Sequence, residues 1–386
     1  MSEAYIVAAA RTAGGRRKGA LSGVHPADLG GTVLNALVNR SGIDPAVIDD
    51  VIMGCVTQAG EQSFAFGRTC VQASCLPDSV PAVTIDRQCG SSQQAVQFAA
   101  QAVISGTQEL VIAAGAESMT RVPMFSNKSL HEQAGIGEGP FPRSVLERYG
   151  VENFSQFTGA KMLAEKYGFA REQLDAFALD SHCKAAAAID SGVFVDEIVP
   201  ITGADGLFAV DEGVRRDTSL EKLGSLAPLE EGSLVTAGNA SQISDGSAGV
   251  LVASAQAVKE HGLTPIARIH HVSVSAGDPV VMLEEPIHAT RRALKKAGMS
   301  LADIDLFEVN EAFASVPMAW LRAFDADPNK LNVHGGAIAL GHPLGASGTR
   351  LMTTLIYALR KRGIKYGLQT MCEAGGMANV TIVEAL

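Results

Sequence analysis

The chain is 386 residues long, enough for two to three domains, and 47% of its residues are hydrophobic, which excludes a disordered protein. Its 41 acidic and 31 basic residues give a formal net charge of −10, so a nucleic-acid partner is not expected. No apolar run approaches the roughly 18 residues of a membrane span, and the first residues lack a secretory signal. We therefore expect a soluble cytoplasmic protein without a membrane partner.

An internal repeat organises the predicted elements. Residues 36–54 and 292–310 align without a gap, and each reads as a helix end, a glycine stop, a short loop and an apolar strand. Residues 106–115 parallel 363–372 at nearly the same offset, 257 instead of 256. Short apolar runs predict strands over 51–56, 82–86, 109–114, 306–310 and 367–372. The pattern predicts an α/β fold of two duplicated halves with mixed, mostly parallel sheets buried on both faces.

The region between the two copies has a different character. Residues 119–242 combine segments rich in glycine and proline with amphipathic helices such as the one predicted over 171–189. Long, partly irregular insertions are usually functional lids or binding loops. We therefore predict an N-terminal half formed by residues 1–118 and 243–265, an inserted loop domain over 119–242 that covers a ligand site, and a C-terminal half over 266–386.

The six cysteines form no C-x-x-C pair and no zinc-ligand spacing with histidine, so neither a metal site nor a disulfide framework is expected. Most of them are expected to be small buried hydrophobes. Cys89 differs, because an apolar strand over 82–86 runs into it and a helix ending at Gly106 follows. A sulfur at a helix N-terminus is favoured as a thiolate nucleophile, although an inert helix-capping turn has the same pattern.

Three further segments place polar groups where chemistry is expected. His342 lies between glycine and proline in a stretch with five glycines, 332–348, which favours a base or an oxyanion donor over a structural histidine. Asn310 and Glu311 follow a buried strand and either cap the next helix or reach into a site. Cys372 ends another buried strand. The carboxyl ends of strands are where α/β sheets carry their catalytic groups.

Taken together, these segments resemble the thiolase family over essentially the whole chain. The start over 7–12, the CGSS turn at 89–92, TAGNASQISDG at 236–246, NEAFA at 310–314, GGAIALGHPLGASG at 335–348 and the final Cys-Gly turn occur in the family's order. The resemblance implies the layered αβαβα fold of thiolases. It also implies an acyl-CoA acyltransferase that uses coenzyme A thioesters as substrates, without a cofactor or a metal.

The resemblance also implies a role for each matching residue. Cys89 matches the nucleophile that takes the acyl group, and His342 matches the histidine that activates it. Cys372 matches the second thiol, which moves the α-proton of acetyl-CoA. Asn310 matches the residue that holds a water and, with His342, forms one oxyanion hole. The backbone N–H groups of Cys89 and Ala374 match those that form the second oxyanion hole.

Contacts with coenzyme A and the assembly follow from the same resemblance. Arg215 matches a basic residue that meets the nucleotide, although Arg215 and Arg216 also fit a solvated charge pair on a loop. Ala237, Ser241 and Phe313 match residues that line the substrate tunnel. The family implies a homotetramer or a homodimer.

The chain departs from the family pattern at several positions, among them Asp86, Ser92, Gln93 and Ala374. At position 374 the family usually has glycine, and alanine would be strained there if its φ were positive. The Ser155-Gln156-Phe157 segment replaces the His-Met-Gly of short-chain enzymes, which favours a wider acyl pocket. Two other functions compete: a β-ketoacyl synthase, which uses two histidines and no second cysteine, and a non-catalytic acyl-CoA or lipid binder, which typically lacks the nucleophile.

Overall fold

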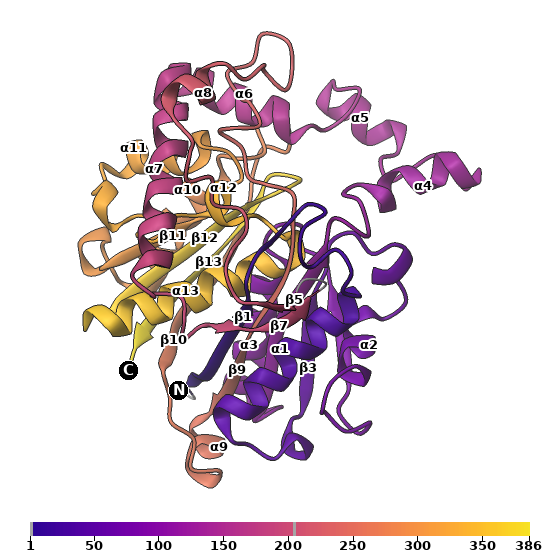
Figure 1. Cartoon of the computed structure of the whole chain (residues 1–386), viewed down its shortest axis with the longest axis vertical. Coiled ribbons are helices and arrows are strands. Elements are labelled where there is room, and N and C mark those ends of the chain that lie inside the picture. Colours follow the sequence, from indigo (N-terminus) through magenta and orange to yellow (C-terminus); the bar gives the residue numbers. More distant parts are fainter. Residues whose placement is uncertain (1–2, 204–205) are drawn as a thin grey trace.

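The computed structural model describes residues 3–203 and 206–386, and most of its strands belong to one mixed sheet, whose main path runs in the order β11-β12-β13-β10-β1-β9-β5-β3-β4 (Figure 1). The short strands Ile201–Gly203 and Gly206–Phe208 pair as a separate sheet. The strands of this path are β1 (Ala4–Thr12), β3 (Asp50–Gly54), β4 (Ala82–Ile85), β5 (Leu110–Ser118), β9 (Ser244–Ser254), β10 (Ala267–Ala276), β11 (Leu306–Val309), β12 (Tyr366–Glu373) and β13 (Met377–Ala385). All five strands predicted from apolar runs are present, with ends shifted by a few residues.

The α/β class is confirmed, but the expectation of mostly parallel pairing is wrong. Along this path, parallel pairs join β3 to β4, β3 to β5 and β11 to β12, whereas β9, β1, β10 and β13 pair antiparallel with their neighbours. Off the path, β1 also pairs parallel with Ile198–Val199. A three-residue turn over 374–376 joins β12 to β13, and so short a connection permits only antiparallel pairing. Apolar runs indicate burial on both faces, which does not distinguish the two directions.

The two copies of the repeat adopt the same succession of elements. Helix α1 (Pro26–Ser41) ends at Gly42, a short 3₁₀ turn follows, and β3 begins; α10 (Glu285–Ala297) ends at Gly298 and leads in the same way to β11. The carboxylate of Asp49 accepts hydrogen bonds from two backbone N–H groups at the start of β5, and Asp305 does the same at the start of β12. The pairing of both strands keeps an offset of 256 residues.

Helices arrange the two halves in five layers. Helices α1 and α2 (Phe66–Gln72) cover the outer face of the first half, and α10 and α11 (Ser315–Phe324) cover that of the second. Between them, α3 (Ser91–Ser105) and α13 (Ser347–Arg362) contact strands of both halves and each other. A Cβ on Gly348 would lie 2.1 Å from the backbone nitrogen of Gln93, so the two central helices touch backbone to backbone.

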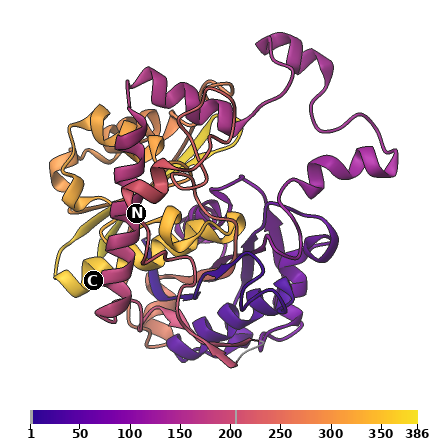
Figure 2. The same cartoon turned by 45° about the horizontal axis from the view of Figure 1, so that its top comes forward.

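Most remaining elements belong to the segment between the halves. Those of the segment are α4 (Ser126–Ala134), α5 (Arg143–Tyr149), α6 (Gln156–Lys166), α7 (Arg171–Asp190), β6 (Ile198–Val199), β7 (Ile201–Gly203), β8 (Gly206–Phe208) and α8 (Leu220–Gly224). Outside it lie β2 (Gly15–Arg16), α9 (Ala255–Glu260) and α12 (Ala337–Leu340). Helices α4 and α5 have no buried residue and stand away from the body as an arm (Figure 2). Helix α6 packs on α11 and α7 on α12, so this segment lies against the second half. No helix of the described residues is long and apolar enough to cross a membrane.

Candidate active site

The candidate nucleophile Cys89 lies in the turn between β4 and α3, one residue before the helix N-cap Gly90. The hydroxyl of Ser91 donates a hydrogen bond to the carbonyl of Gln88 at 2.6 Å and accepts one from the N–H of Arg87 at 2.9 Å. Gln88 has a φ of 49°, a left-handed conformation that is uncommon for a residue with a Cβ and often marks functional sites. The turn therefore holds Cys89 in a fixed, strained position.

The resting Cys89 side chain is a neutral thiol. Burial raises the pKa of the Cys89 thiol well above its ordinary value, and the nearby Cys372 and Glu373 raise this pKa further. The prediction that the helix N-terminus favours the thiolate is therefore wrong for the resting protein. Loss of hydration is the largest cause, so the thiol needs a nearby base to lose its proton.

The candidate base, His342, lies in the turn that precedes α13. It is buried, and its backbone N–H donates to the carbonyl of Gln242 at 3.1 Å. Gly341, with a φ of 88°, and Pro343 flank it, so the backbone has little freedom on either side. The turn therefore fixes the position of the imidazole ring, as expected from its glycine-rich sequence.

Hydrogen bonds also fix which ring nitrogen of His342 carries the proton. Nδ1 lies 2.6 Å from the hydroxyl oxygen of Ser347, and that hydroxyl donates to the carbonyl of Pro343 at 2.8 Å. Because the hydroxyl proton is used, Nδ1 must be the donor, which leaves Nε2 as the free base. Burial, reinforced by Arg350, lowers the pKa of His342 to about 3, so the ring is neutral near pH 7.

Replacing Ser347 with alanine should lower kcat/KM by roughly 10- to 100-fold, because the Nδ1–H of His342 loses its acceptor and the tautomer with a free Nε2 is no longer favoured. Steady-state kinetics near pH 7.5 would measure this. Thr349→Val is the matched control: its hydroxyl is also buried in the first turn of α13 and donates to the carbonyl of Ala248 instead. Equal losses in both variants would show that Ser347 acts only through helix stability.

Asn310 and Glu311 take different roles at the end of β11. The side-chain nitrogen of Asn310 lies 3.4 Å from Nε2 of His342, and its Oδ1 has no partner among the residues that the structure describes. Glu311 instead accepts hydrogen bonds from Ser181 at 2.7 Å and Asn332 at 2.9 Å. Of the two alternatives for this pair, Asn310 reaches into the site and Glu311 braces the surrounding loops.

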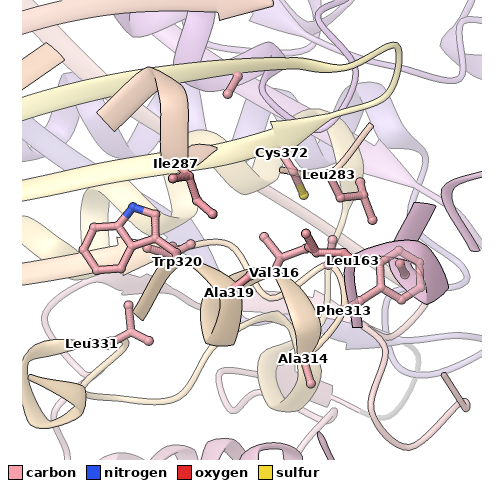
Figure 3. Packing of buried hydrophobic residues seen from close by; sticks show 14 of the residues in the cluster. Leu163, Leu283, Ile287, Phe313, Ala314, Val316, Ala319, Trp320, Leu331 and Cys372 are labelled. Carbon is pink, nitrogen blue, oxygen red and sulfur yellow. The ribbon is translucent and has the colours of Figure 1, made fainter. Parts of the chain in front are cut away.

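The second candidate thiol, Cys372, lies on β12 and is buried. Figure 3 shows its sulfur pointing out of the sheet into the cluster that contains Leu283 and Phe313. Burial and the adjacent Glu373 raise the pKa of Cys372 to about 12. Cys372 is therefore also protonated in the resting protein.

The turn after Cys372 accommodates alanine without strain. Positive φ values occur at Gly375, 89°, and Gly376, 75°, but not at Ala374, so the expected penalty does not arise. Within residues 3–203 and 206–386, the backbone N–H groups of Cys89 and Ala374 donate no hydrogen bond. Free backbone donors of this kind can receive an oxyanion.

The segment around Ser241 lies against the strand end that carries Asn310. The N–H of Ser241 donates to the carbonyl of Ala312 at 2.9 Å, and Ala240 forms a bridge with Phe313. The next residue, Gln242, is the partner of the His342 backbone. The structure therefore brings Ser241 and Phe313 beside the histidine.

Arg215 and Ala237 are exposed, farther out along the chain. The loop of Arg215 is tied to the site because the side chain of Gln242 donates to the carbonyl of Gly213 at 2.8 Å. Arg216 pairs with Asp190 at 2.7 Å, whereas the guanidinium of Arg215 forms no ion pair within the described residues. The solvated charge pair expected as an alternative therefore involves Arg216.

Two of the departures from the family pattern join the halves of the molecule. The hydroxyl of Ser92 accepts the N–H of Thr349 at 2.9 Å. The side chain of Gln93 donates to the carbonyl of Gln369 at 3.1 Å and to the hydroxyl of Thr381 at 3.0 Å. Both side chains are buried and satisfied, so the polar residues at these positions serve the contact between α3, α13 and the second half.

Sequence reasoning missed Ser347 and Glu373. Ser347 lies five residues after His342 in the motif, and its contact with Nδ1 depends on how the turn folds back. Glu373 follows Cys372, and only the packing shows that it is buried beneath the turn between β4 and α3 that carries Cys89, called the nucleophile turn below. No group of three or more potential metal ligands occurs among the described residues.

Comparison with known proteins gives the same picture over the whole chain. Residues 4–256 match the family model of the thiolase N-terminal domain, and residues 263–385 match that of the thiolase C-terminal domain. The steroid 3-ketoacyl-CoA thiolase FadA6 of Mycobacterium tuberculosis is 52% identical over 100% of this chain and 95% of its own length. An acetyl-CoA acetyltransferase of Thiocystis violacea is 44% identical over 99% of this chain and 98% of its own.

The fold is shared as well. The crystal structure of the Bacillus anthracis acetyl-CoA acetyltransferase superimposes with a TM-score of 0.91 and 38% identity, covering 100% of this chain and 99% of that one. Identities of this size over full-length chains, together with both family models, establish common activity as well as common architecture. The chain belongs to the thiolase family and is an acyl-CoA C-acyltransferase.

Proposed function

We propose that this thiolase works in degradation: it cleaves a 3-ketoacyl-CoA with free coenzyme A into acetyl-CoA and a shortened acyl-CoA, with Cys89 as the acyl carrier. The observation that carries the proposal is the buried turn that places the Cys89 thiol, with a free backbone N–H, within electrostatic reach of a second buried thiol. Condensation of acetyl-CoA is the same reaction in reverse.

In the first half-reaction, Nε2 of His342 accepts the proton of Cys89, and the thiolate attacks the 3-keto carbon of the substrate. The bond between C2 and C3 breaks, and its electron pair forms the enolate of acetyl-CoA. The protonated Nε2 of His342 and a water held by Asn310 stabilise the enolate oxygen. Cys372 then donates its proton to C2, and acetyl-CoA leaves.

In the second half-reaction, the Cys372 thiolate accepts the proton of the incoming coenzyme A thiol. That sulfur attacks the acyl-enzyme, and the N–H groups of Cys89 and Ala374 hold the oxyanion that forms. When the intermediate collapses, the bond to Cys89 breaks and the thiolate regains its proton from His342. Arg215, Ala237, Ser241 and Phe313 are the proposed contacts of the coenzyme A thioester.

The competing functions predict different products. A β-ketoacyl synthase would condense acyl groups without thiolysis by free coenzyme A, and a non-catalytic binder would leave the thioester intact. Mixing a 3-ketoacyl-CoA with isotopically labelled coenzyme A distinguishes thiolysis from both alternatives. Label in the shortened acyl-CoA supports thiolysis, whereas an unchanged substrate would contradict the proposed function.

The segment 155–157 supports an acyl pocket wider than an acetoacetyl group needs. Ser155 caps α6 and donates to Glu230 at 3.2 Å, and the ring of Phe157 meets Phe313 edge to face at 5.7 Å. The half-buried side chain of Gln156 forms no hydrogen bond within the described residues, as expected beside a wetter cavity. The 52% identical relative is named as a steroid 3-ketoacyl-CoA thiolase, which agrees with a ring-bearing substrate.

We expect medium-chain, long-chain or ring-bearing 3-ketoacyl-CoA thioesters to be better substrates than acetoacetyl-CoA. Each methylene buried in the pocket adds up to about 0.8 kcal/mol, or roughly fourfold in kcat/KM. The measurement is kcat/KM for a series of chain lengths and one steroid-like thioester. If acetoacetyl-CoA is the best substrate, Phe157 fills the pocket and the enzyme is a short-chain acetyltransferase.

A homodimer or homotetramer in the cytoplasm remains our proposal for the assembly. It is supported by β4, which lies at the end of the sheet and exposes Val83, and by the neighbouring loop, where the side chain of Phe64 is 94% exposed. An unpaired edge strand beside exposed apolar side chains is suited to contact with a second copy.

A further inference from the structure

A buried carboxyl group without partners lies beneath the nucleophile turn. Glu373, at the end of β12, has no exposed surface, yet neither of its carboxyl oxygens has a hydrogen-bond partner among the residues that the structure describes. Burial of an unsatisfied polar group costs free energy, so native proteins keep few of them, and those that remain need an explanation. The proposed reaction does not use this group.

The position of Glu373 relates it directly to Cys89. Consecutive side chains of a strand point to opposite faces, so Cys372 and Glu373 leave β12 on different sides. Met371 shares the face of Glu373 and packs in the same cluster as Cys89. A Cβ on Gly90 would lie 2.0 Å from Oε1 of Glu373, which places the carboxyl group against the backbone of the nucleophile turn.

The repeat supplies an internal comparison. At the offset of 256 residues, Glu117 corresponds to Glu373 and Gly345 corresponds to Cys89. Glu117 is also fully buried, but its carboxylate accepts the N–H of Gly345 at 2.9 Å and hydrogen bonds from Val56, Thr57 and Gln62. In the second copy, the carboxyl group of Glu373 accepts no such bond from the described residues, and the N–H of Cys89 donates none to them. The position that is structural in one half is therefore unsatisfied in the half that meets the nucleophile.

The groups that face Glu373 from the surrounding elements are few. They are Cys89 and Arg87 in the turn between β4 and α3 and, from β13, the uncharged Asn379 and Met377. Cys372 adjoins Glu373 in the chain but lies on the other face of β12, and Asp86 in the turn also raises the pKa of Cys89. Burial raises the pKa of Glu373 to about 8, and Arg87 and, to a smaller extent, the backbone of Asn379 oppose that rise. The carboxyl group therefore changes charge close to physiological pH, within reach of both thiols.

We propose that Glu373 is a positioning residue that supports the nucleophile turn and, through its own ionisation, sets how readily Cys89 and Cys372 release their protons. The neutral carboxyl group permits thiolate formation, and the carboxylate opposes it by like-charge repulsion. This inference rests on the proposed role of Cys89. It adds to the site a titratable group whose ionisation opposes thiolate formation. The two thiols therefore lose their protons most readily at pH values at which the carboxyl group of Glu373 is still neutral.

The test measures the thiol directly, without turnover. The rate of Cys89 alkylation by iodoacetamide, followed by mass spectrometry of its peptide, is recorded against pH for wild type, Glu373→Gln and Glu373→Asp. Glutamine removes the charge with little change of shape, so the midpoint should fall by about one pH unit, which is roughly tenfold faster alkylation at a fixed pH below it. Aspartate keeps the charge, so its midpoint should stay near that of wild type.

Glu308→Gln is the matched control. Glu308 is a fully buried glutamate on the neighbouring strand β11, its Oε2 lacks a partner within the described residues, and the pKa of Glu308 is also raised to about 8. Glu308 is not among the groups that shift the pKa of either thiol, so this variant should keep the wild-type midpoint. Equal shifts in Glu373→Gln and Glu308→Gln, or in Glu373→Gln and Glu373→Asp, would overturn the proposal.

The pH dependence of Cys89 alkylation in the wild-type protein tests the proposal even if the variants fail to fold. Ionisation of a coupled carboxyl group should flatten the rise of log rate with pH between about pH 7 and pH 9 before the rise resumes. A uniform slope of one through that range would contradict the role of Glu373. Absence of an acyl adduct on Cys89 would instead contradict the proposed function, so the two failures can be told apart.

Discussion

Replacement of Cys89 with alanine should abolish both thiolysis and condensation, with a fall in kcat of at least about 10⁴-fold, because no acyl-enzyme can form. The thiol is the only nucleophile proposed at the start of α3, and the neighbouring base cannot replace it. Stopped-flow or steady-state assays in both directions measure the loss. Mass spectrometry of the wild-type protein mixed with an acyl-CoA should show the acyl adduct on Cys89.

Cys70→Ala is a suitable control for this variant. Cys70 is also buried, but it lies in α2 on the outer layer of the first half, where its sulfur packs against Gly30. Removing it should lower stability through a small cavity and leave the acyl adduct unchanged. An adduct on another cysteine, or full activity of Cys89→Ala, would show that the nucleophile is elsewhere.

Replacement of Cys372 with alanine should separate the two half-reactions. The variant should still form acyl-enzyme on Cys89 from an acyl-CoA, but transfer of that acyl group to acetyl-CoA should slow by roughly 10²- to 10⁴-fold, because no group moves the α-proton. Rapid-mixing experiments that follow the adduct by mass spectrometry measure formation and decay independently.

A Cys372→Ser variant sharpens this result, because it retains the size of the side chain but is a far weaker acid than a thiol. It should accumulate acyl-enzyme in the same way as the alanine variant, which excludes a packing defect in the cluster around Cys372 as the cause. Loss of the acylation step alone, with normal turnover of preformed acyl-enzyme, is the opposite outcome and would assign the two thiols the other way round.

The repeat and the strand positions could be predicted because they depend on local signals. Gly42 and Gly298 stop their helices in the left-handed conformation that glycine adopts readily, and Asp49 and Asp305 hold the next strand in the same way. Strand direction could not be predicted from the apolar runs. It depends on long-range pairing, and in the second half on the three-residue turn after β12.

The identities of the candidate site residues were accessible from the sequence, but their electrostatics were not. Proximity to a helix N-terminus suggested a thiolate at Cys89, yet the balance is set by burial and by Glu373, which is distant from Cys89 in sequence. Likewise, the tautomer of His342 depends on a hydroxyl group, Ser347, whose orientation only the folded turn fixes. The protonation states of Cys89 and His342 therefore depend on which groups the fold packs around them.

The backbone contact at Gly348 fixes the relative position of the two turns that carry Cys89 and His342. The proposed nucleophile, Cys89, precedes the first turn of α3, and the proposed base, His342, precedes the first turn of α13. These two turns touch where Gly348 meets Gln93. A hydrogen bond from Thr349 to Ser92 crosses the same contact. The separation of sulfur and imidazole is thus set when the protein folds, by two clamped helices, and no loop has to close to create it. Preorganisation of this kind removes a reorganisation step from each catalytic cycle, and motion is left to the substrate.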